Sequence, residues 1–336
     1  MALFKTTAQL KDYLSVDINT KFATMLPFIT EAEQQFIIPL IGQTLYDLVN
    51  TQYNGDTLDA DNNALLPYIQ RPLAYYAQLL SISSLTVTFG DRGIREHLSQ
   101  DSATAPRWKE EKLQLDALIK GDRYADLLLK FLEDNAADDK YVSWFESTTL
   151  NTKLSGAIVY STAIASTYTP ISESRRIFLR MKQAIKDIER TYIPRIISKT
   201  EYAQLVSKIQ DQANTALTSK ETDLISKLEP LISRYALYKT IPYMSVGIGP
   251  NGGIFNYSGV DSLRYVGQYA TEADIKRILS SLKEDFERDE QELTQFMIDN
   301  ADTYTLYKAS NAYTGRPDPG PMFIPDNDIT NKYFSV

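Results

Sequence analysis

Two stretches of this chain of 336 residues read as copies of each other, and no other feature limits the fold as strongly. Residues 36–41 read FIIPLI and residues 191–196 read TYIPRI, at an offset of 155 positions. The offset that aligns later segments becomes 159 and then 165, so it only grows, as insertions in loops would make it. Because a repeat decides the whole architecture, we predict two tandem copies of one module.

The later matches support the same interpretation. At the offset of 159, LTVTFG at 85–90 aligns with MSVGIG at 244–249. At the offset of 165, FLEDNA at 131–136 aligns with FMIDNA at 296–301. One such match could arise by chance between helical segments, but matches in chain order favour a duplication.

Apolar spacing predicts that each copy is mainly helical. One set of residues falls at intervals of 4, 4, 3 and 4 positions, which places it on one buried helix face: Leu65, Ile69, Leu73, Tyr76 and Leu80. The second copy is predicted to end in a long helix from Glu272 to Asn300. Alternation followed by glycine-containing turns predicts a small β-hairpin in each copy, at 85–96 and at 244–257.

Polar residues before apolar runs predict where some helices begin. Thr44 is expected to cap a short helix that runs through Tyr53, and Asp122 is expected to cap a helix around Leu128. In the long second-copy helix one apolar set is expected to form the buried side: Ile278, Leu282, Phe286, Leu293 and Phe296. The carboxylates of residues 283–292 then lie on the solvated face, interleaved with basic residues.

The fold class that follows is mainly α, with two helical-bundle modules, each with a hairpin, and an extended C-terminal arm. The boundaries are 1–150 for the first module, 151–312 for the second and 313–336 for the arm. The arm carries three prolines in five residues and cannot be helical. It is either a loosely packed terminus or a segment that docks on a neighbouring subunit.

Composition removes several classes of chemistry. Lys and Arg number 35 against 43 Asp and Glu, a net charge of −8, which argues against a protein that grips nucleic acid through its overall field. The absence of cysteine excludes disulfides, thiolate nucleophiles and cysteine-based metal sites. His97 is the one histidine, so a single chain cannot build a histidine-only metal cluster.

The sequence indicates neither a signal peptide nor a membrane span. The first residues hold no apolar core of signal-peptide length, and no apolar run approaches the roughly 20 residues that a spanning helix needs. We therefore expect a soluble protein that is retained where it is made.

One nucleotide-binding signature occurs, in the wrong context. Residues 247–252 read GIGPNG and satisfy G-x-G-x-x-G, but a helix-like segment precedes them and a strand-like segment follows. The dinucleotide motif needs the opposite order, with a strand before it and a helix after it. A hairpin turn that uses glycines explains the segment better. His97, past the first predicted hairpin, is in turn far more simply a surface residue than a general base.

Tyrosine is abundant, at 22 residues, and several tyrosines are expected along the central helices: Tyr75, Tyr76, Tyr235, Tyr238 and Tyr243. Tyrosine suits subunit interfaces because it joins apolar area to a polar tip, and it equally suits ordinary half-buried helix faces. Neither interpretation gives a catalytic residue, a metal ligand or a cofactor site.

The opening of the chain resembles the head–tail connector, or adaptor, proteins of tailed bacteriophages. Residues 6–17 read TTAQLKDYLSVD, similar to the Leu-Lys-x-Tyr-Leu-x-Val/Ile-Asp helix of those proteins, and a helix ending before a short glycine turn follows. The whole chain looks closer to an uncharacterised family from phages and prophages of Bacteroidota, through FIIPLIG at 36–42, YYA at 75–77 and the GDRG turn at 90–93. A narrower resemblance within that group is to the neck ring proteins of crAss-like phages. Simple connectors carry one module, whereas this chain carries two.

The resemblance implies a structural protein of the virion, made in the host cytoplasm. It implies a homo-oligomeric ring, a dodecamer in such proteins, that contacts portal, tail or other neck proteins, lets DNA pass without specific binding and touches no membrane. The hairpins and the arm would then make the contacts, through Asp91, Arg92, Asn251, Phe255, Ile324, Tyr333 and Phe334. The resemblance implies no enzyme activity, cofactor or metal.

Two other classes stay open at the level of sequence. One is a monomeric helical scaffold or regulator in the host cytoplasm, which oligomeric state would distinguish from a connector. The other is an enzyme or small-ligand protein whose site is not written in a recognisable motif.

Overall fold

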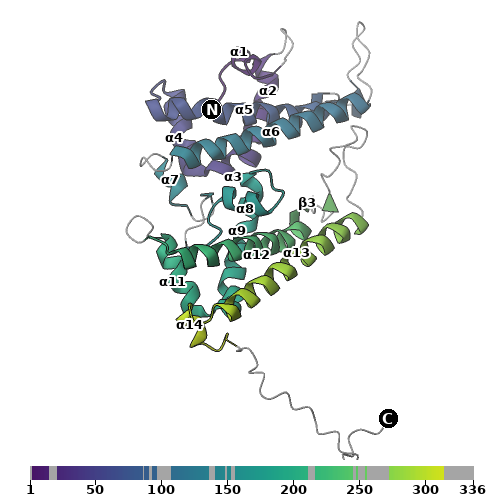
Figure 1. Ribbon diagram of the computed structural model, residues 1–336. Coiled ribbons are helices and arrows are strands. Elements are labelled where there is room, and N and C mark those ends of the chain that lie inside the picture. Colours follow the sequence, from purple (N-terminus) through teal and green to yellow (C-terminus); the bar gives the residue numbers. More distant parts are fainter. Residues whose placement is uncertain are drawn as a thin grey trace, which may run out of the picture.

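The protein is described here by a computed structural model that covers residues 2–14, 21–85, 87–90, 93–96, 107–135, 141–147, 150–152, 156–210, 216–244, 247–248, 254–255 and 272–313. Within these ranges the fold is mainly helical, as predicted. Figure 1 shows two helical layers one above the other, with the N-terminal half in the upper part and the C-terminal half in the lower part.

The first half contains one long helical pair with shorter helices around it. Its elements in chain order are α1 (Thr7–Lys11), α2 (Phe22–Ala32), the π-helical turn η1 (Glu33–Ile37), α3 (Ile38–Ile41), α4 (Gln43–Asn54), α5 (Ala60–Leu85), β1 (Val87–Gly90), β2 (Gly93–Glu96), α6 (Arg107–Asn135) and α7 (Val142–Phe145). Helices α5 and α6 lie side by side and form the centre of this half (Figure 1).

The second half repeats this order of elements. It contains α8 (Thr162–Tyr168), α9 (Arg175–Thr191), α10 (Ile193–Ile197), α11 (Lys199–Gln210), α12 (Ser219–Met244), β3 (Gly247–Ile248), β4 (Ile254–Phe255), α13 (Glu272–Asp299) and α14 (Thr305–Lys308). Helices α12 and α13 correspond to α5 and α6, and α9 takes the place of α2 and η1. The duplication is therefore a duplication of structure.

Two short antiparallel pairs of strands follow α5 and α12. The first joins Val87 to Glu96 and Gly90 to Gly93, and the second joins Gly247 to Phe255. Much of the hairpin predicted at 244–257 lies outside the described residues. The strands add no described side chain to either core, so helix packing alone holds the described fold together.

The predicted helix faces are largely confirmed. Leu65, Ile69, Leu73 and Tyr76 are buried in α5, and Leu80 is partly buried. Helix α13 ends within one residue of the predicted end. The periodicity located these faces because each helix turns one stripe toward a neighbouring helix and leaves the opposite stripe in water.

Two predicted caps are wrong. Thr44 lies inside α4, because Gly42 precedes that helix with a φ of 83°, a conformation that favours glycine. Asp122 lies in the middle of α6, which runs unbroken from residue 107 to residue 135. In a sequence, an acidic residue before an apolar run looks the same at a helix cap and within a helix. Here tertiary contacts determine that Asp122 lies within α6.

The predicted buried side of α13 is wrong at two positions. Ile278 is 46% exposed, whereas Asp289, expected on the solvated face, is buried. The Asp289 carboxylate accepts hydrogen bonds of 2.6 and 2.7 Å from Arg234 of α12. A buried carboxylate needs such a partner. At the corresponding place in the first half, the rings of Tyr75 and Tyr124 stack with centroids 5.4 Å apart.

The two halves also share ring contacts that only the fold makes visible. Phe36 stacks on Tyr76 with ring centroids 4.2 Å apart, and at the matching place Tyr192 stacks on Tyr235 at 5.2 Å. Each half has its own buried apolar cluster, with members between residues 2 and 144 in the first and between residues 157 and 307 in the second. We call the two halves module one and module two.

Candidate functional site

The contact between the modules, which we call the seam, is built on Tyr76, Asp122 and Arg176. The Tyr76 hydroxyl donates to Asp122 Oδ1 at 2.8 Å, and Arg176 donates to the Tyr76 oxygen at 3.1 Å and pairs with the Asp122 carboxylate. Tyr76 and Asp122 belong to module one, and Arg176 belongs to module two. Burial, more than the adjacent Asp122 carboxylate, raises the pKa of Tyr76 well above its ordinary value. The phenol therefore stays protonated and serves as a donor to Asp122.

In the other contacts of the seam, the N-terminus of α9 binds acidic side chains of α6. Ser174 caps α9, and its hydroxyl donates to Asp126 at 2.9 Å. The backbone N–H of Arg176 donates to the same carboxylate at 3.0 Å. Arg175 donates to Glu133 at 2.7 Å, with about a tenth of each side chain exposed. Carboxylates are favourable at a helix N-terminus, where unpaired N–H groups point outward. The contact is thus complementary in charge and in geometry.

Gly121 allows this arrangement to form. A Cβ at residue 121 would lie 2.7 Å from the nearest atom of the Tyr76 ring, so only glycine lets α6 come this close. Phe36 covers another face of the same ring. Tyr76 is consequently fixed between α6 and η1, with its hydroxyl directed at the seam.

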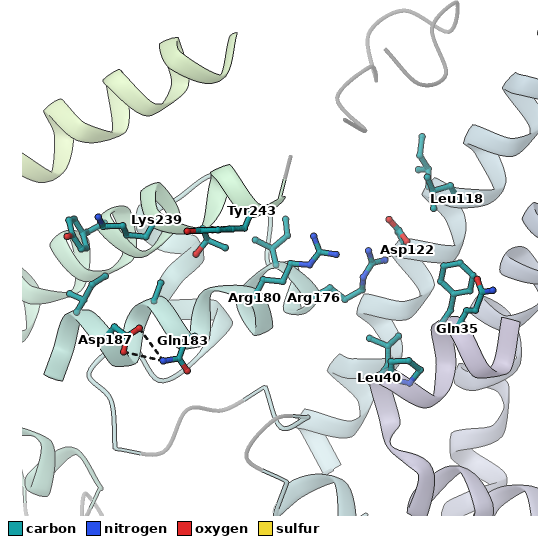
Figure 2. Close-up of a pocket in the computed structure, with 18 of the residues that line it drawn as sticks. Gln35, Leu40, Leu118, Asp122, Arg176, Arg180, Gln183, Asp187, Lys239 and Tyr243 are labelled. Carbon is teal, nitrogen blue, oxygen red and sulfur yellow. Dashed lines mark hydrogen bonds and ion pairs between the residues drawn. The ribbon is translucent and has the colours of Figure 1, made fainter. Parts of the chain in front are cut away.

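A groove of about 1500 Å³ opens along the seam and continues into module two. Figure 2 shows Arg176 pointing toward Asp122, with Arg180, Gln183 and Asp187 following it along α9. One wall comes from module one and the other from α10 and α12. The lining is apolar, aromatic and basic: Phe36, Tyr76, Leu118, Ile119, Ile177, Tyr192, Arg195, Tyr235, Lys239 and Tyr243 are among its residues.

The exposure of these side chains indicates a surface suited to docking. Tyr243 is 81% exposed and Ile119 is 44% exposed, although both are large and apolar. Lys239 lies over the ring of Tyr235, 5.2 Å from its centroid. Aromatic rings beside fixed cations are typical of protein–protein interfaces. Among the lining residues that the structure describes there is neither a histidine nor a serine that could form a nucleophile–base pair.

A second repeated cluster is a buried glutamate in each module, which the sequence did not indicate. Glu33 accepts the backbone N–H of Leu3 at 2.7 Å. Glu189 accepts the backbone N–H of Ile158 at 3.0 Å and the hydroxyl of Tyr202 at 2.7 Å. Burial raises the pKa of both carboxyls, and the hydrogen bonds oppose the rise. Each glutamate therefore connects, through hydrogen bonds, the first described residues of its module to the helical segment that carries the glutamate, η1 in module one and α9 in module two.

These glutamates were hidden because their partners are backbone groups far away in the chain. At the offset of 155 that the prolines indicate, residue 33 aligns with Ile188, so the sequence repeat did not pair them. The glutamates correspond only at an offset of 156, at which Gly42 and Ser198, both with a positive φ, also correspond. The residues that they hold, Leu3 and Ile158, lie 155 positions apart. A charged residue that recurs in a duplicated module indicates a shared structural need.

The contact residues implied by the resemblance fall almost entirely outside the described part of the chain. Asp91, Arg92, Asn251, Ile324, Tyr333 and Phe334 lie outside the described residues, as do His97 and the arm beyond Tyr313. Phe255 lies in β4, and its backbone alone is described. The groove and the seam therefore come from the fold, not from the predicted contacts.

No group of three or more potential metal-ligating side chains occurs among the described residues. None of the described helices is long and apolar enough to cross a membrane.

A family model matches the chain twice, over residues 37–153 and 193–317, and it describes a family of unknown function, DUF6712. The two matches coincide with the two modules, although the structural repeat begins earlier in each. No curated protein and no solved structure matches the chain.

Proposed function

This chain belongs to the DUF6712 family, whose function is unknown, and it carries the family's module twice. We propose that it is a structural virion protein of a tailed bacteriophage. In this proposal copies of the chain form a ring at the neck, between portal and tail, and the ring lets DNA pass. The resemblance of residues 6–17, 36–42 and 75–77 to head–tail connectors points to this class.

The observation that carries the proposal is the contact between the modules. Module one offers the acidic face of α6, and module two offers the capped N-terminus of α9, so two copies of one module meet through different surfaces. A contact of this kind is heterologous. Heterologous contacts between identical units generate rings when the rotation closes.

The charge supports passage of DNA without adhesion. The chain carries a net charge of −8, and basic side chains at the seam are paired with carboxylates, as Arg175 is with Glu133. Nonspecific DNA binding depends on unpaired cations that displace counterions from phosphates. An acidic ring would therefore repel the DNA that moves through it.

The test is the mass of the purified chain by light scattering, with negative-stain images of the same sample. The sample is measured alone and again after mixing with purified portal and tail-neck proteins of the same phage. Rings, formed alone or only in the mixture, are the expected result. A chain that stays monomeric in both samples overturns the proposal and directs attention to a scaffold or regulator.

A further inference from the structure

The groove along the seam carries positive charge that the rest of the described structure does not balance. Arg180, Arg195 and Lys239 all line the groove, and all three are exposed. Within the part of the chain that the structure describes, none of these three side chains forms an ion pair. A ligand that fills the groove therefore meets cations that are free to bind a carboxylate.

The two carboxylates of the groove lining already have partners. Asp122 pairs with Arg176 at the seam. Asp187 accepts hydrogen bonds from Gln183 at 3.2 Å and from Arg190 at 3.1 Å, both on its own helix. The negative charge that would balance the groove has to come from its occupant.

The wall that module one contributes is apolar. Ile119 of α6 is 44% exposed, and Leu115 and Leu118 of the same helix are partly exposed. Figure 2 shows Leu118 on one side of the groove and Arg180 and Lys239 on the other. The groove is thus suited to an occupant with an apolar part for α6 and an acidic part for α9 and α12.

The arm of this chain contains a segment of that composition. Residues 322–329 read MFIPDNDI, with three large apolar residues first, then aspartates at 326 and 328, and neither lysine nor arginine. We call these residues the acidic segment. Extended, eight residues span about 26 Å. The groove follows α9 from Arg176 to Thr191, about 22 Å at 1.5 Å per residue, so the segment matches the groove in length as well as in charge.

The place where the arm begins favours a second copy of the chain as its source. Tyr304 donates to the backbone oxygen of Lys220 at 2.8 Å, so the chain that precedes the arm lies at the start of α12. Lys239 lies about 28 Å farther along that helix. Figure 1 places α14 at the edge of module two that is remote from module one. The prolines of residues 315–321 predict an extended, semi-rigid spacer, which favours carrying the acidic segment away from its own module.

We propose that the groove of one copy binds the acidic segment of a second copy. Residues 322–324 lie against α6, and the carboxylates of Asp326 and Asp328 lie beside Arg180 and Lys239. This inference rests on the proposed function, since it supplies a contact through which each copy gives its arm to one neighbour and receives the arm of another. Such a contact is heterologous, and it generates a ring when the rotation closes.

The absence of cysteine from the chain allows a direct test by cross-linking. Gln183→Cys places one thiol in the groove of a chain that carries a size tag, the groove chain. Asn327→Cys places one thiol between the two aspartates of an untagged chain, the arm chain. The two full chains are mixed and treated with a short bismaleimide, alone and again with purified portal and tail-neck proteins. A product that joins the groove chain to the arm chain is expected.

The control for position is Gln43→Cys in the tagged chain. Like Gln183, Gln43 is exposed on a helix and donates to an aspartate four residues later, but it lies outside the groove lining. This control is expected to yield at least tenfold less product with the arm chain than Gln183→Cys does.

Charge reversal tests the pairing itself. Arg180→Glu with Lys239→Glu in the groove chain is expected to lower the yield about tenfold or more, because like charges then face each other. Asp326→Lys with Asp328→Lys in the arm chain is expected to restore the yield with this reversed groove.

The control for charge is Lys130→Glu with Lys186→Glu in the groove chain. Both lysines are exposed and lie outside the groove lining, and the pair changes the net charge by the same amount. The yield is expected to equal that of the groove chain without these changes. Circular dichroism verifies that every variant is folded.

The outcomes identify the occupant. A chain with both Gln183→Cys and Asn327→Cys that cross-links only within itself assigns the groove to its own arm and overturns the inference. Protection of the groove thiol by portal or neck proteins, with no cross-link to the arm, assigns the groove to one of those proteins and also overturns it.

The outcomes also separate this inference from the proposed function. Rings without a cross-link between groove and arm overturn the inference and leave the connector proposal standing. A cross-link between chains that form no ring, alone or in the mixture, supports the contact and overturns the connector proposal. A chain that stays monomeric in both samples and gives no cross-link overturns both.

Discussion

Replacing Gly121 by alanine tests how closely α6 approaches α5. The added Cβ would lie 2.7 Å from Cε1 and 2.9 Å from Cδ1 of Tyr76, closer than real Cβ contacts come. The Tyr76 ring cannot move aside, since it is 1% exposed, stacks on Phe36 at 4.2 Å and donates to Asp122 at 2.8 Å. Either α6 or the ring must therefore shift.

Two effects of opposite sign decide the result. Alanine is favoured over glycine in a helix interior by about 1 kcal/mol. Overpacking a filled site costs about 1–3 kcal/mol, toward the upper end where no neighbour can yield. We expect Gly121→Ala to lower the free energy of unfolding of module one by about 1–2 kcal/mol in sum.

The chain provides its own reporter for this measurement. Both tryptophans, Trp108 and Trp144, belong to module one, so tryptophan fluorescence follows that module alone. Trp144 is fully buried and donates to the backbone oxygen of Leu40 at 3.2 Å. In a Trp108→Phe background, urea unfolding then reports on a single buried residue, and the midpoint is compared at constant m-value.

Lys130→Ala, on the exposed face of the same helix, serves as the control and is expected to change stability by less than about 0.5 kcal/mol. A Gly121→Ala variant that equals or exceeds the parent in stability would refute the reasoning. It would mean that the helix preference outweighs the contact and that α6 does not approach Tyr76 as closely as described.

Three further predictions concern buried charges. Glu189→Ala is expected to destabilise module two more than Glu189→Gln, because glutamine keeps one acceptor for the backbone N–H of Ile158. Burial raises the pKa of Glu189 in the folded state above its ordinary value of 4.5, so the free energy of unfolding of the parent falls as the pH rises past that value. Denaturation of both proteins from pH 4 to 8 is expected to show this fall in the parent and not in Glu189→Gln. Arg175→Ala leaves Glu133, of whose side chain about a tenth is exposed, without its partner, and it is expected to cost about 3 kcal/mol; a thermal midpoint equal to that of the parent would contradict the seam. Asp289→Ala is expected to destabilise similarly, and Arg234→Leu combined with Asp289→Leu is expected to recover most of the loss in the same thermal assay. A double variant no more stable than Asp289→Ala would contradict this prediction.

The candidate site could be predicted from the sequence only in part. The tyrosines at 76 and 235 were expected along central helices, and that placement is confirmed. Their roles were not predicted, because Tyr76 meets Asp122 and Arg176 across separations of 46 and 100 residues. Spacing within one helix carries no information about partners so far away in the chain.

The errors follow from the same limit. Asp122 was interpreted as a cap and Asp289 as a solvated carboxylate, and each has an arginine partner on another helix. Local patterns record which side chains are polar, but not whether a second helix supplies the opposite charge. That information arises only when the helices pack.

By itself the sequence determined the mainly helical class, the duplication and the long helix that ends near residue 300. These features depend on interactions between residues three or four apart, and on two segments that obey the same local rules. The tertiary structure alone decided the seam, the groove and the buried glutamates. The seam and the groove join surfaces of different modules, and each glutamate joins segments of one module that are far apart in the chain. Their stability comes from removing paired charges and aromatic area from water, which a linear sequence does not specify.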